Sequence, residues 1–365
     1  MKSRLYAPGP VELPPQVLAA LSQPVQHHRT AAFAELQERV SGRLAEVFLV
    51  PGDEVITLSS SGSGAMEAAF LACVPRGSKV LAINAGKFGE RWVNLASAHG
   101  AQVVELKADW GRAADPKQLA QLLEDHPDVT AVLATHSETS TGVLHDIQAL
   151  AAAARRVNPD ILFLVDAVTS LASAELRPRE WQLDAVVSGS QKGLLTPPGL
   201  GFAWLSERAW AQDPGLLAPS YYLNLHGYRG GRQPMTPATS LIAALDVALG
   251  LLLAEGLEQV WARRQRLTAL LIEETAALGF SVFAERVTPA VAALKVPEGV
   301  SARQLVSDLA SLGVTIAGGQ DHVADLIVRP SLLGHADELD VAVIVAALKK
   351  ALQRQRPVSQ PDAGR

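Results

Sequence analysis

Short apolar runs alternate with amphipathic stretches through most of the first two thirds of the chain. Seven runs have the length and composition of β-strands: 55–60, 79–86, 102–108, 129–137, 161–169, 183–190 and 199–206. Helix-like segments such as AMEAAFLACV, FGERWVNLASAHG, PKQLAQLLED and IQALAAAARRV separate several of them. Runs that are apolar throughout, rather than at every second position, are typical of strands that helices cover on both faces. The pattern therefore predicts an α/β domain with a mainly parallel seven-stranded sheet.

The pattern changes near residue 234, where the segment QPMTPATSL introduces two prolines. A long Ala/Leu-rich helical stretch follows, from about Leu241 to Leu278, and shorter strands and helices continue to about Arg354. We therefore expect an N-terminal arm at 1–14, a large domain at 15–240 and a smaller C-terminal α+β domain at 241–356, attached by the long helix. The tail at 357–365 has no apolar periodicity and is expected to fray.

Composition narrows the class of protein. The chain has 365 residues, of which 48% are hydrophobic, and this length suits two domains. The net charge is −5 and the sequence has no basic run, so it does not predict a positively charged surface that would bind nucleic acid or a membrane. No run reaches the roughly 18 apolar residues that a membrane span needs. The single cysteine, Cys73, excludes an intrachain disulfide, so a soluble protein of the cytoplasm is expected.

Polar clusters stand at the carboxyl ends of four of the predicted strands. They occupy residues 59–64, 136–141, 166–170 and 188–192. Ligands of open α/β sheets bind outside the carboxyl ends of the strands. The four clusters together therefore predict a ligand site at this edge of the sheet.

Lys192 stands in the stretch SGSQKGLLTPPGLG, among glycine, serine and glutamine rather than on an amphipathic helix. A lysine drawn into the interior has a lowered pKa and can attack a carbonyl as a neutral amine. The alternative is a solvated loop lysine.

Asp166 ends an apolar strand, ILFLVDA. A buried carboxylate requires a cation or several hydrogen-bond donors, and a protonated pyridine nitrogen is one cation that satisfies it. The alternative is a carboxylate that caps a helix or accepts bonds from loop amides, which the neighbouring Thr169 and Ser170 keep open.

The segment SSSGSGAMEAAF leads from a strand into a helix. Gly62 and Gly64 permit close backbone approach, and the first N–H groups of the helix together with the serine hydroxyls form a cup suited to phosphate. No lysine follows the glycines, so this is not a Walker-type loop. The alternative is an ordinary helix cap.

Taken in order, these motifs resemble the class V (fold type I) aminotransferases, and within them the alanine–glyoxylate and serine–glyoxylate branch. The motifs are Pro8-Gly9-Pro10, HHR at 27–29, SGSGAMEAA, KFGERW at 87–92, HSETSTG at 136–142, VDAVTS at 165–170 and SGSQKGLL at 188–195. GGQDH at 318–322 and VRPSLLGH at 328–335 resemble the C-terminal motifs of that branch. The resemblance extends from residue 8 to about residue 335.

The resemblance implies pyridoxal 5'-phosphate (PLP) as the cofactor and no metal. Lys192 matches the lysine that forms the Schiff base and shuttles the proton, and Asp166 matches the partner of the pyridine nitrogen. The other implied cofactor contacts are Ser61, Gly62, Ser63 and Gln191 at the phosphate, Phe88 and Val168 on the two ring faces, and Thr139 or Ser140 at the phenolic oxygen. Phe88 has the alternative of a core aromatic.

Three further roles follow from the resemblance. Gly9 and Arg329 match the substrate contacts, and a guanidinium can bind a carboxylate through two parallel hydrogen bonds. A structural salt bridge is the alternative for Arg329. Thr236 matches a residue that reaches the cofactor phosphate of the neighbouring subunit, which implies a homodimer with shared active sites.

Two positions depart from the family pattern. Relatives commonly have Arg-Ile-Gly-His where this chain has Arg329-Pro330-Ser331. The aromatic expected shortly before Thr236 is absent, and Gln233 or Arg232 is a candidate to replace it.

The resulting hypothesis is a PLP-dependent aminotransferase that moves an amino group from alanine or serine to glyoxylate or pyruvate. One arginine anchor favours small, singly charged acids. Phosphoserine or aspartate transamination is the alternative. In that case His27, His28 or Arg29 would bind the second anionic group of the substrate; otherwise these residues have a structural role. A cysteine desulfurase would need a mobile thiol, whereas Cys73 stands in an apolar helix. A catalytically inactive protein of this fold, used only for binding or assembly, would have no physical need for both Lys192 and Asp166.

Overall fold

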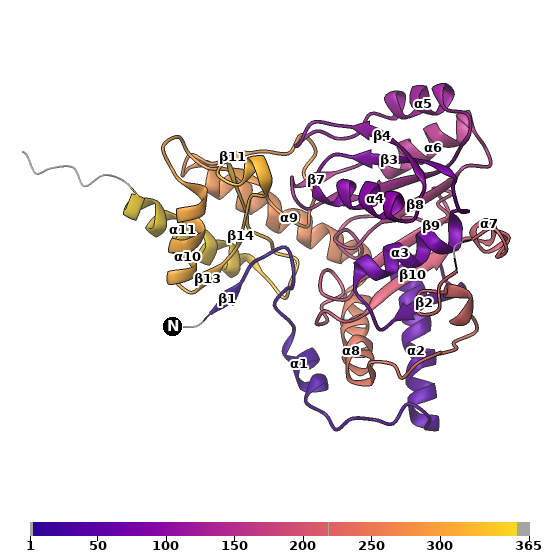
Figure 1. Cartoon of the computed structure of the whole chain (residues 1–365). Helices are drawn as coiled ribbons and strands as arrows, with labels where there is room; N and C mark the ends of the chain where they lie inside the picture. The colour runs from indigo at the N-terminus through magenta and orange to yellow at the C-terminus, as the bar shows by residue number, and fades with distance from the viewer. Residues whose placement is uncertain (1–2, 218, 356–365) are drawn as a thin grey trace, which may run out of the picture.

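Seven strands of the larger part of the molecule form a single sheet. The computed structural model describes residues 3–217 and 219–355 (Figure 1). The sheet has the order β2-β10-β9-β8-β5-β3-β4. Its strands are β2 (Val55–Leu58), β3 (Lys79–Asn84), β4 (Gln102–Lys107), β5 (Val129–Thr135), β8 (Leu162–Asp166), β9 (Ala185–Gly189) and β10 (Gly201–Leu205). Only β10 within this sheet pairs antiparallel with its neighbours, β9 and β2. The predicted mainly parallel seven-stranded sheet is confirmed.

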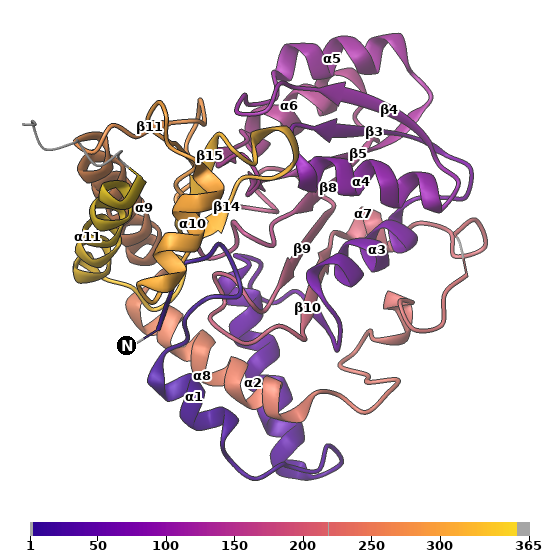
Figure 2. The same cartoon turned by 60° about the vertical axis from the view of Figure 1, so that its left-hand side comes forward.

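Helices cover both faces of this sheet (Figure 2). Leu81 and Ile83 of β3 pack into one hydrophobic core, and the intervening Val80 and Ala82 pack into the other. One face carries α1 (Pro15–Leu21), α2 (Ala31–Val47), α5 (Pro116–Asp125), α6 (Ile147–Val157) and α8 (Thr239–Glu255). The opposite face carries α3 (Gly62–Cys73), α4 (Lys87–Ala98), α7 (Glu207–Trp210) and η1 (Leu225–Gly227). Burial on both sides explains why the strands are apolar at every position.

The smaller part has its own sheet and core. Its four-stranded sheet has the order β11-β12-β15-β14. The elements are α9 (Leu257–Ala276), β11 (Ser281–Val282), β12 (Leu294–Lys295), α10 (Ala302–Ser311), β13 (Val314–Thr315), β14 (Ala317–Gly318), η2 (Asp321–Val323), β15 (Ile327–Arg329) and α11 (Glu338–Gln355). Strand β1 (Arg4–Leu5), at the start of the chain, pairs in parallel with β13. The N-terminal arm is therefore attached to the smaller part (Figure 1).

The single long helix expected at 241–278 is wrong. The structure has two helices there, α8 and α9, which meet at Gly256 with a bend of 85°. Gly256 has φ +86°, a backbone conformation that residues with a side chain rarely adopt. Helix α8 packs in the core of the large sheet, whereas Leu267 and Leu271 of α9 pack in the core of the smaller part. Helix α8 therefore packs with the large sheet, and the domain division expected at 240/241 stays a prediction. The expected tail at 357–365 lies outside the described residues.

No helix among the described residues is by itself long and apolar enough to cross a membrane. Helices α8 and α9 pass that test of length and composition only as a pair, across their bend.

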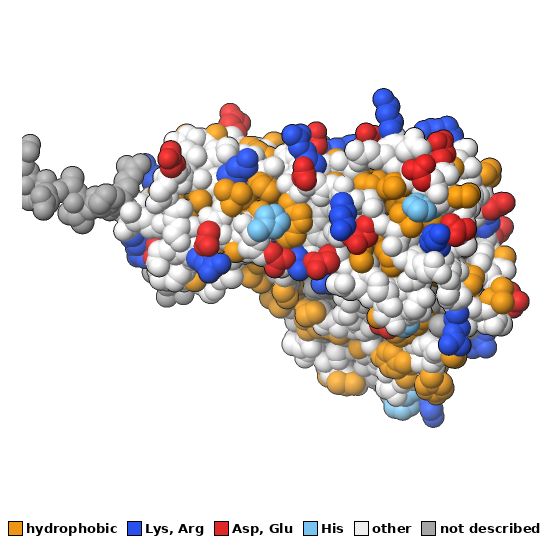
Figure 3. Space-filling view, turned by 45° about the horizontal axis from the view of Figure 1, so that its top comes forward, with side chains coloured by type: hydrophobic (Ala, Val, Ile, Leu, Met, Phe, Trp, Pro, Cys, Tyr) orange, Lys and Arg blue, Asp and Glu red, His pale blue; other side chains and the backbone are white. Residues whose placement is uncertain are grey.

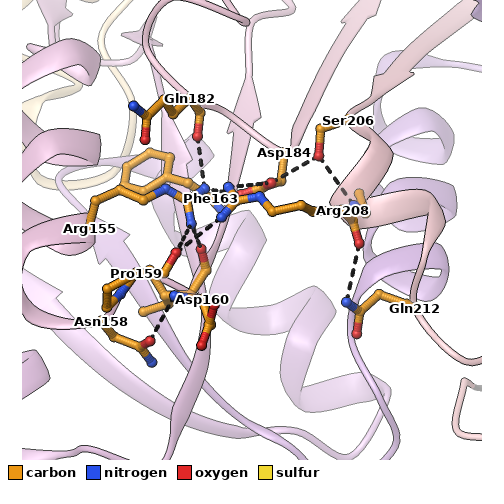
Figure 4. Close-up of polar contacts among 12 residues, drawn as sticks. Arg155, Asn158, Pro159, Asp160, Phe163, Gln182, Asp184, Ser206, Arg208 and Gln212 are labelled. Atoms are coloured by element: carbon orange, nitrogen blue, oxygen red, sulfur yellow. Dashed lines mark hydrogen bonds and ion pairs between the residues drawn. The ribbon is translucent and has the colours of Figure 1, made fainter.

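A buried ion-pair cluster stabilises the amino end of β9, at the edge opposite the predicted ligand site (Figure 4). Asp184, which precedes β9, is fully buried. Its carboxylate accepts hydrogen bonds from Arg155 at 2.5 Å, Arg208 at 2.8 Å, Phe163 N at 2.7 Å and Ser206 Oγ at 2.9 Å. Burial raises the pKa of Asp184, and Arg155 opposes that rise most strongly. The cluster ties α6, β8, β9 and α7 together.

Replacing Asp184 with Asn should lower the free energy of unfolding by about 3 kcal/mol, because Arg155 is then left without its anionic partner. Urea denaturation followed by circular dichroism measures the change. Asp325→Asn is the matched control, since the Arg303–Asp325 pair is 71% and 64% exposed. The control should shift stability by less than about 1 kcal/mol. Equal losses in the two variants would contradict a structural role for the cluster.

Candidate active site

The predicted polar clusters meet at the carboxyl ends of β5, β8 and β9. The strand register places Thr135 beside Asp166 and Asp166 beside Val187. Because these three strands are parallel neighbours, the segments that follow them leave the sheet at the same edge. The residues predicted from the separate motifs can therefore act on one ligand.

Lys192 is buried, with 9% of its surface exposed, so it is not a solvated loop lysine. Its Nζ donates a hydrogen bond to the carbonyl oxygen of Pro8 at 2.5 Å. Burial and the positive charge of Arg329 lower the pKa of Lys192 to about 8, and Asp166 opposes the shift. The side chain can therefore lose its proton near neutral pH.

The N-terminal arm closes over Lys192. Gly9 has φ +133°, and a Cβ at this position would lie 2.4 to 2.7 Å from the Cδ, Cε and Nζ atoms of Lys192. Only glycine therefore fits here. Hydrogen bonds from Tyr6 Oη to Asp340 at 2.6 Å and from Ser331 N to Tyr6 O at 2.8 Å hold the arm to the smaller part.

Asp166 ends β8 with 3% of its surface exposed. Its Oδ1 accepts a hydrogen bond from Val168 N at 2.8 Å. Burial raises the pKa of Asp166 to about 6, and the Val168 N–H, Arg91 and Lys192 oppose that rise. The loop amide provides one donor, and the remaining lone pairs leave capacity for a cationic partner.

The segment at 61–63 forms the start of α3, as predicted. Ser61 caps the helix, and its Oγ accepts a hydrogen bond from Gly64 N at 3.2 Å. A Cβ at Gly62 would lie 2.6 Å from Cγ2 of Val168, so the helix start lies against the turn at 168–173 that follows Asp166, here called the Asp166 turn.

The Gln191 side chain lies beside this helix start. A Cβ at Gly189 would lie 2.9 Å from Gln191 Oε1 and 3.3 Å from Gly62 N. Gln191 Oε1 is buried and has no hydrogen-bond partner among the described residues. A buried polar atom of this kind indicates a partner supplied by a ligand or by water.

The hairpin formed by β6 (Ser137–Glu138) and β7 (Val143–Leu144) carries Thr139 and Ser140 in its turn. Ser140 Oγ donates to Glu138 at 2.5 Å and accepts from Lys87 N at 3.1 Å. Thr139 Oγ1 donates to Thr169 Oγ1 at 2.8 Å. The Ser140 hydroxyl is therefore engaged with the start of α4, whereas the Thr139 hydroxyl lies beside the Asp166 turn.

Arg329, at the end of β15, has 7% of its surface exposed. Its Nε donates to Gly318 O and its Nη1 donates to Thr139 O, both at 2.8 Å. The ion pairs found among residues 3–217 and 219–355 do not include Arg329. Burial lowers its pKa to about 10, and Glu138 opposes the shift. The guanidinium charge therefore remains available to an anionic ligand.

Other predicted positions are not brought into this cluster. Thr236 is exposed in the segment before α8, and Arg232 and Gln233 precede it there. His27 and His28 stack on each other, with ring centroids 4.8 Å apart, in the loop between α1 and α2.

The family model for Aminotransferase class-V matches residues 5–343. The chain is a class V aminotransferase. The soluble hydrogenase 42 kDa subunit of Anabaena cylindrica is 36% identical over 96% of this chain and 93% of that protein. Serine–glyoxylate aminotransferase of Methylorubrum extorquens is 30% identical over 96% of this chain and 91% of that protein. The crystal structure of a subgroup IV aspartate aminotransferase from Thermus thermophilus superposes with a TM-score of 0.89, at 36% identity, covering 97% of this chain and 100% of that one.

Membership of this family and the similarity to its solved structures make the chain a PLP-dependent transaminase. The relatives differ in the substrates that their names state. The choice of amino donor is therefore a separate question from the reaction type.

Sequence reasoning missed two charged residues of this aminotransferase. Glu138 is buried within HSETSTG, and an acidic residue directly after an apolar strand was a signal for a buried anion. Arg91 donates to Ser63 Oγ at 2.9 Å, and its guanidinium carbon lies 4.8 Å from the ring centroid of Phe88. The spacing of three residues between Phe88 and Arg91 places them on one helix face, which could have predicted this contact.

Because its pKa is lowered, Lys192 of the cofactor-free protein should react with an acylating reagent at a lower pH than other lysines do. Trace labelling with acetic anhydride across pH 6–11, read by peptide mass spectrometry, should show half-maximal reactivity of Lys192 near pH 8. Ordinary surface lysines should reach half-maximal reactivity near pH 10.4. A Lys192 midpoint in that higher range would show that its amine is not desolvated.

Proposed function

We propose that this aminotransferase holds PLP on Lys192 and moves an amino group from alanine or serine to glyoxylate or pyruvate. The observation that carries the proposal is the burial of the Lys192 amine and the Asp166 carboxylate at the carboxyl ends of adjacent strands. The unpartnered Gln191 Oε1 and the close approach of Gly62 to Val168 fit a bound group at the same place.

In this proposal residues of three segments hold the aldehyde carbon, the ring nitrogen and the phosphate of the cofactor. Lys192 binds its aldehyde carbon, and Asp166 pairs with the protonated ring nitrogen. The phosphate lies at the α3 N-terminus, contacting Ser61, Gly62, Ser63 and Gln191, where the free N–H groups of the helix favour an anion. Bound PLP supplies an electron sink for the bonds at the substrate α-carbon.

The ring lies between Phe88 and Val168, with a side-chain hydroxyl at its phenolic oxygen. The proposal assigns that hydroxyl to Thr139, because it lies beside the turn that follows Asp166, bonded to Thr169 Oγ1, whereas the Ser140 hydroxyl is bonded to Glu138 and Lys87 N at the start of α4.

Lys192 also carries the proton in this scheme. With a pKa of about 8, roughly one free amine in ten is neutral at pH 7. The Pro8 carbonyl accepts a hydrogen bond from Nζ and so holds the amine in place when it is not bonded to the cofactor. The site therefore keeps a proton acceptor of suitable strength at a fixed position.

The covalent assignment is tested by reduction of the PLP-loaded protein with borohydride and peptide mapping. The label should be found on Lys192 only, and Lys192→Ala should abolish transamination. Lys117→Ala, an exposed lysine of α5, is the control and should retain full activity. A label on another side chain would refute the assignment. Failure of both alanine and serine to change the visible absorbance of the bound cofactor would refute the donor assignment.

Arg329 is proposed to bind the substrate carboxylate. A lysine offers no planar pair of donors, so Arg329→Lys should raise KM for every amino donor by about 10- to 100-fold. Steady-state kinetics with alanine and serine measures the effect. Arg303→Lys is the control, because Arg303 is 71% exposed. An unchanged KM in Arg329→Lys would place the carboxylate elsewhere.

Aspartate or phosphoserine is the second candidate donor. Arg91 donates a hydrogen bond to Ser63. Its positive charge lowers the pKa of both Asp166 and Lys192. A second cation therefore lies near the site. The structural relative from Thermus thermophilus is described as an aspartate aminotransferase. Relative rates with alanine, serine, aspartate and phosphoserine distinguish these donors.

Desulfurase chemistry is the less favoured alternative. Cys73 is fully buried in α3, and burial raises the pKa of its thiol. A protonated, enclosed thiol is a poor nucleophile.

The proposal includes a homodimer with shared active sites. Large apolar side chains are exposed around α1 and in the segment before α8, including Leu18, Val25 and Tyr221 at 53%, 78% and 88%. Thr236 lies in that same segment. On the face shown in Figure 3, side chains of both charges are interspersed, which favours small-molecule substrates over a polyanionic partner.

A further inference from the structure

Glu138 is a buried carboxylate surrounded by donors from the candidate site. Its side chain has 1% of its surface exposed. Oε1 accepts from Ser140 Oγ at 2.5 Å and from Ser140 N at 3.2 Å. Oε2 accepts from Phe88 N at 3.1 Å and from Gly89 N at 3.0 Å. Burial raises the pKa of Glu138, and the hydrogen bonds from Ser140, Gly89 N and Phe88 N, which favour the ionised form, oppose that rise.

The chain leaves room for this carboxylate at the start of α4. A Cβ at Gly86 would lie 2.6 Å from Glu138 Cδ and 2.4 Å from Ser140 Oγ. The φ of Gly86 is 161°, which is extended backbone, so close contact rather than backbone conformation restricts this position. The first N–H groups of α4 then point at an anion, which the helix dipole favours.

Helix α4 lies close against the sheet at Gly89. A Cβ at Gly89 would lie 2.5 Å from Ile83 O and 2.9 Å from Asn84 Cα, so the first turn of α4 packs directly on the end of β3. Glu138 therefore links the β6–β7 hairpin to a fixed support, and Phe88 lies in the turn that it binds.

The other side of the same hairpin bonds the smaller part. Arg329 Nη1 donates to the carbonyl oxygen of Thr139, the residue after Glu138. The Thr139 hydroxyl contacts Thr169 in the Asp166 turn. Residues proposed to meet the cofactor ring, its phenolic oxygen and the substrate carboxylate are thus arranged around one side chain.

We propose that Glu138 is a positioning residue that fixes Phe88, Thr139 and Arg329 relative to one another. The inference rests on the proposed function, since it concerns where the cofactor ring and the substrate carboxylate are held. Glu138 touches neither of them. It acts through the backbone of the α4 start and through the hairpin.

Glu138→Gln tests this role, because an amide nitrogen replaces one acceptor and faces backbone N–H groups. We expect the dissociation constant of PLP and the KM for the amino donor each to rise about tenfold. The visible circular dichroism band of the bound cofactor should fall to half or less. All three are measured at a temperature at which the variant is folded.

Asp184→Asn is the matched control. Asp184 is also fully buried and also has several donors, but they lie at the opposite edge of the sheet. It should lose stability while cofactor affinity, KM and the dichroic band stay within twofold of the wild type. If Glu138→Gln behaves in the same way, Glu138 is only a structural residue and the proposal is overturned.

Gly86→Ala is the second variant, and it decides the question if Glu138→Gln does not fold. The added methyl group displaces Glu138 and Ser140 and should weaken cofactor binding several-fold; unchanged binding would overturn the proposal. Wild-type protein that binds no PLP would refute the proposed function itself. If the wild-type protein binds PLP and both variants bind it equally well, only the role of Glu138 is refuted.

Discussion

The candidate active site depends on the burial of two groups of opposite charge, the Lys192 ammonium and the Asp166 carboxylate, in a setting that favours the neutral form of each. Burial lowers the pKa of the lysine to about 8 and raises that of the aspartate to about 6. Leaving water costs each ion several kcal/mol unless partners compensate it. The two residues lie at the carboxyl ends of β8 and β9, where the cofactor proposed above, with an electrophilic carbon and a cationic ring nitrogen, would relieve this cost for both.

The site is completed only where the two parts of the molecule meet. The large sheet provides Lys192, Asp166 and the start of α3. The smaller part provides Arg329 from β15, and the arm that carries Gly9 is paired with β13. An ion pair of 2.9 Å between Lys87 and Asp321 also joins α4 to η2. Movement of the smaller part would therefore change the position of Arg329, the proposed substrate anchor, and the cover of Lys192 together.

The two buried carboxylates outside the reactive pair show how similar chemistry is used differently. Asp184 accepts bonds from two arginines and stabilises the amino end of β9. Glu138 accepts bonds mainly from backbone N–H groups at the opposite edge. Asp184 holds elements of the scaffold together, and Glu138 lies among residues that are proposed to face the ligand. Position relative to the carboxyl ends of the strands, rather than burial, separates the two.

The sequence by itself determined the sheet and its reactive edge, because continuous apolar strands with polar ends report burial and direction locally. It indicated Lys192 and Asp166 for the same reason, since each directly follows or ends such a strand. It could not show the bend at Gly256, because one glycine in an apolar helical pattern is compatible with a straight helix. Nor could it show that Pro8 contacts Lys192, that Glu138 contacts Phe88, or that Arg329 contacts the hairpin beside them. Those contacts join segments tens to hundreds of residues apart, and only the packing of the two parts decides which side chains share one place.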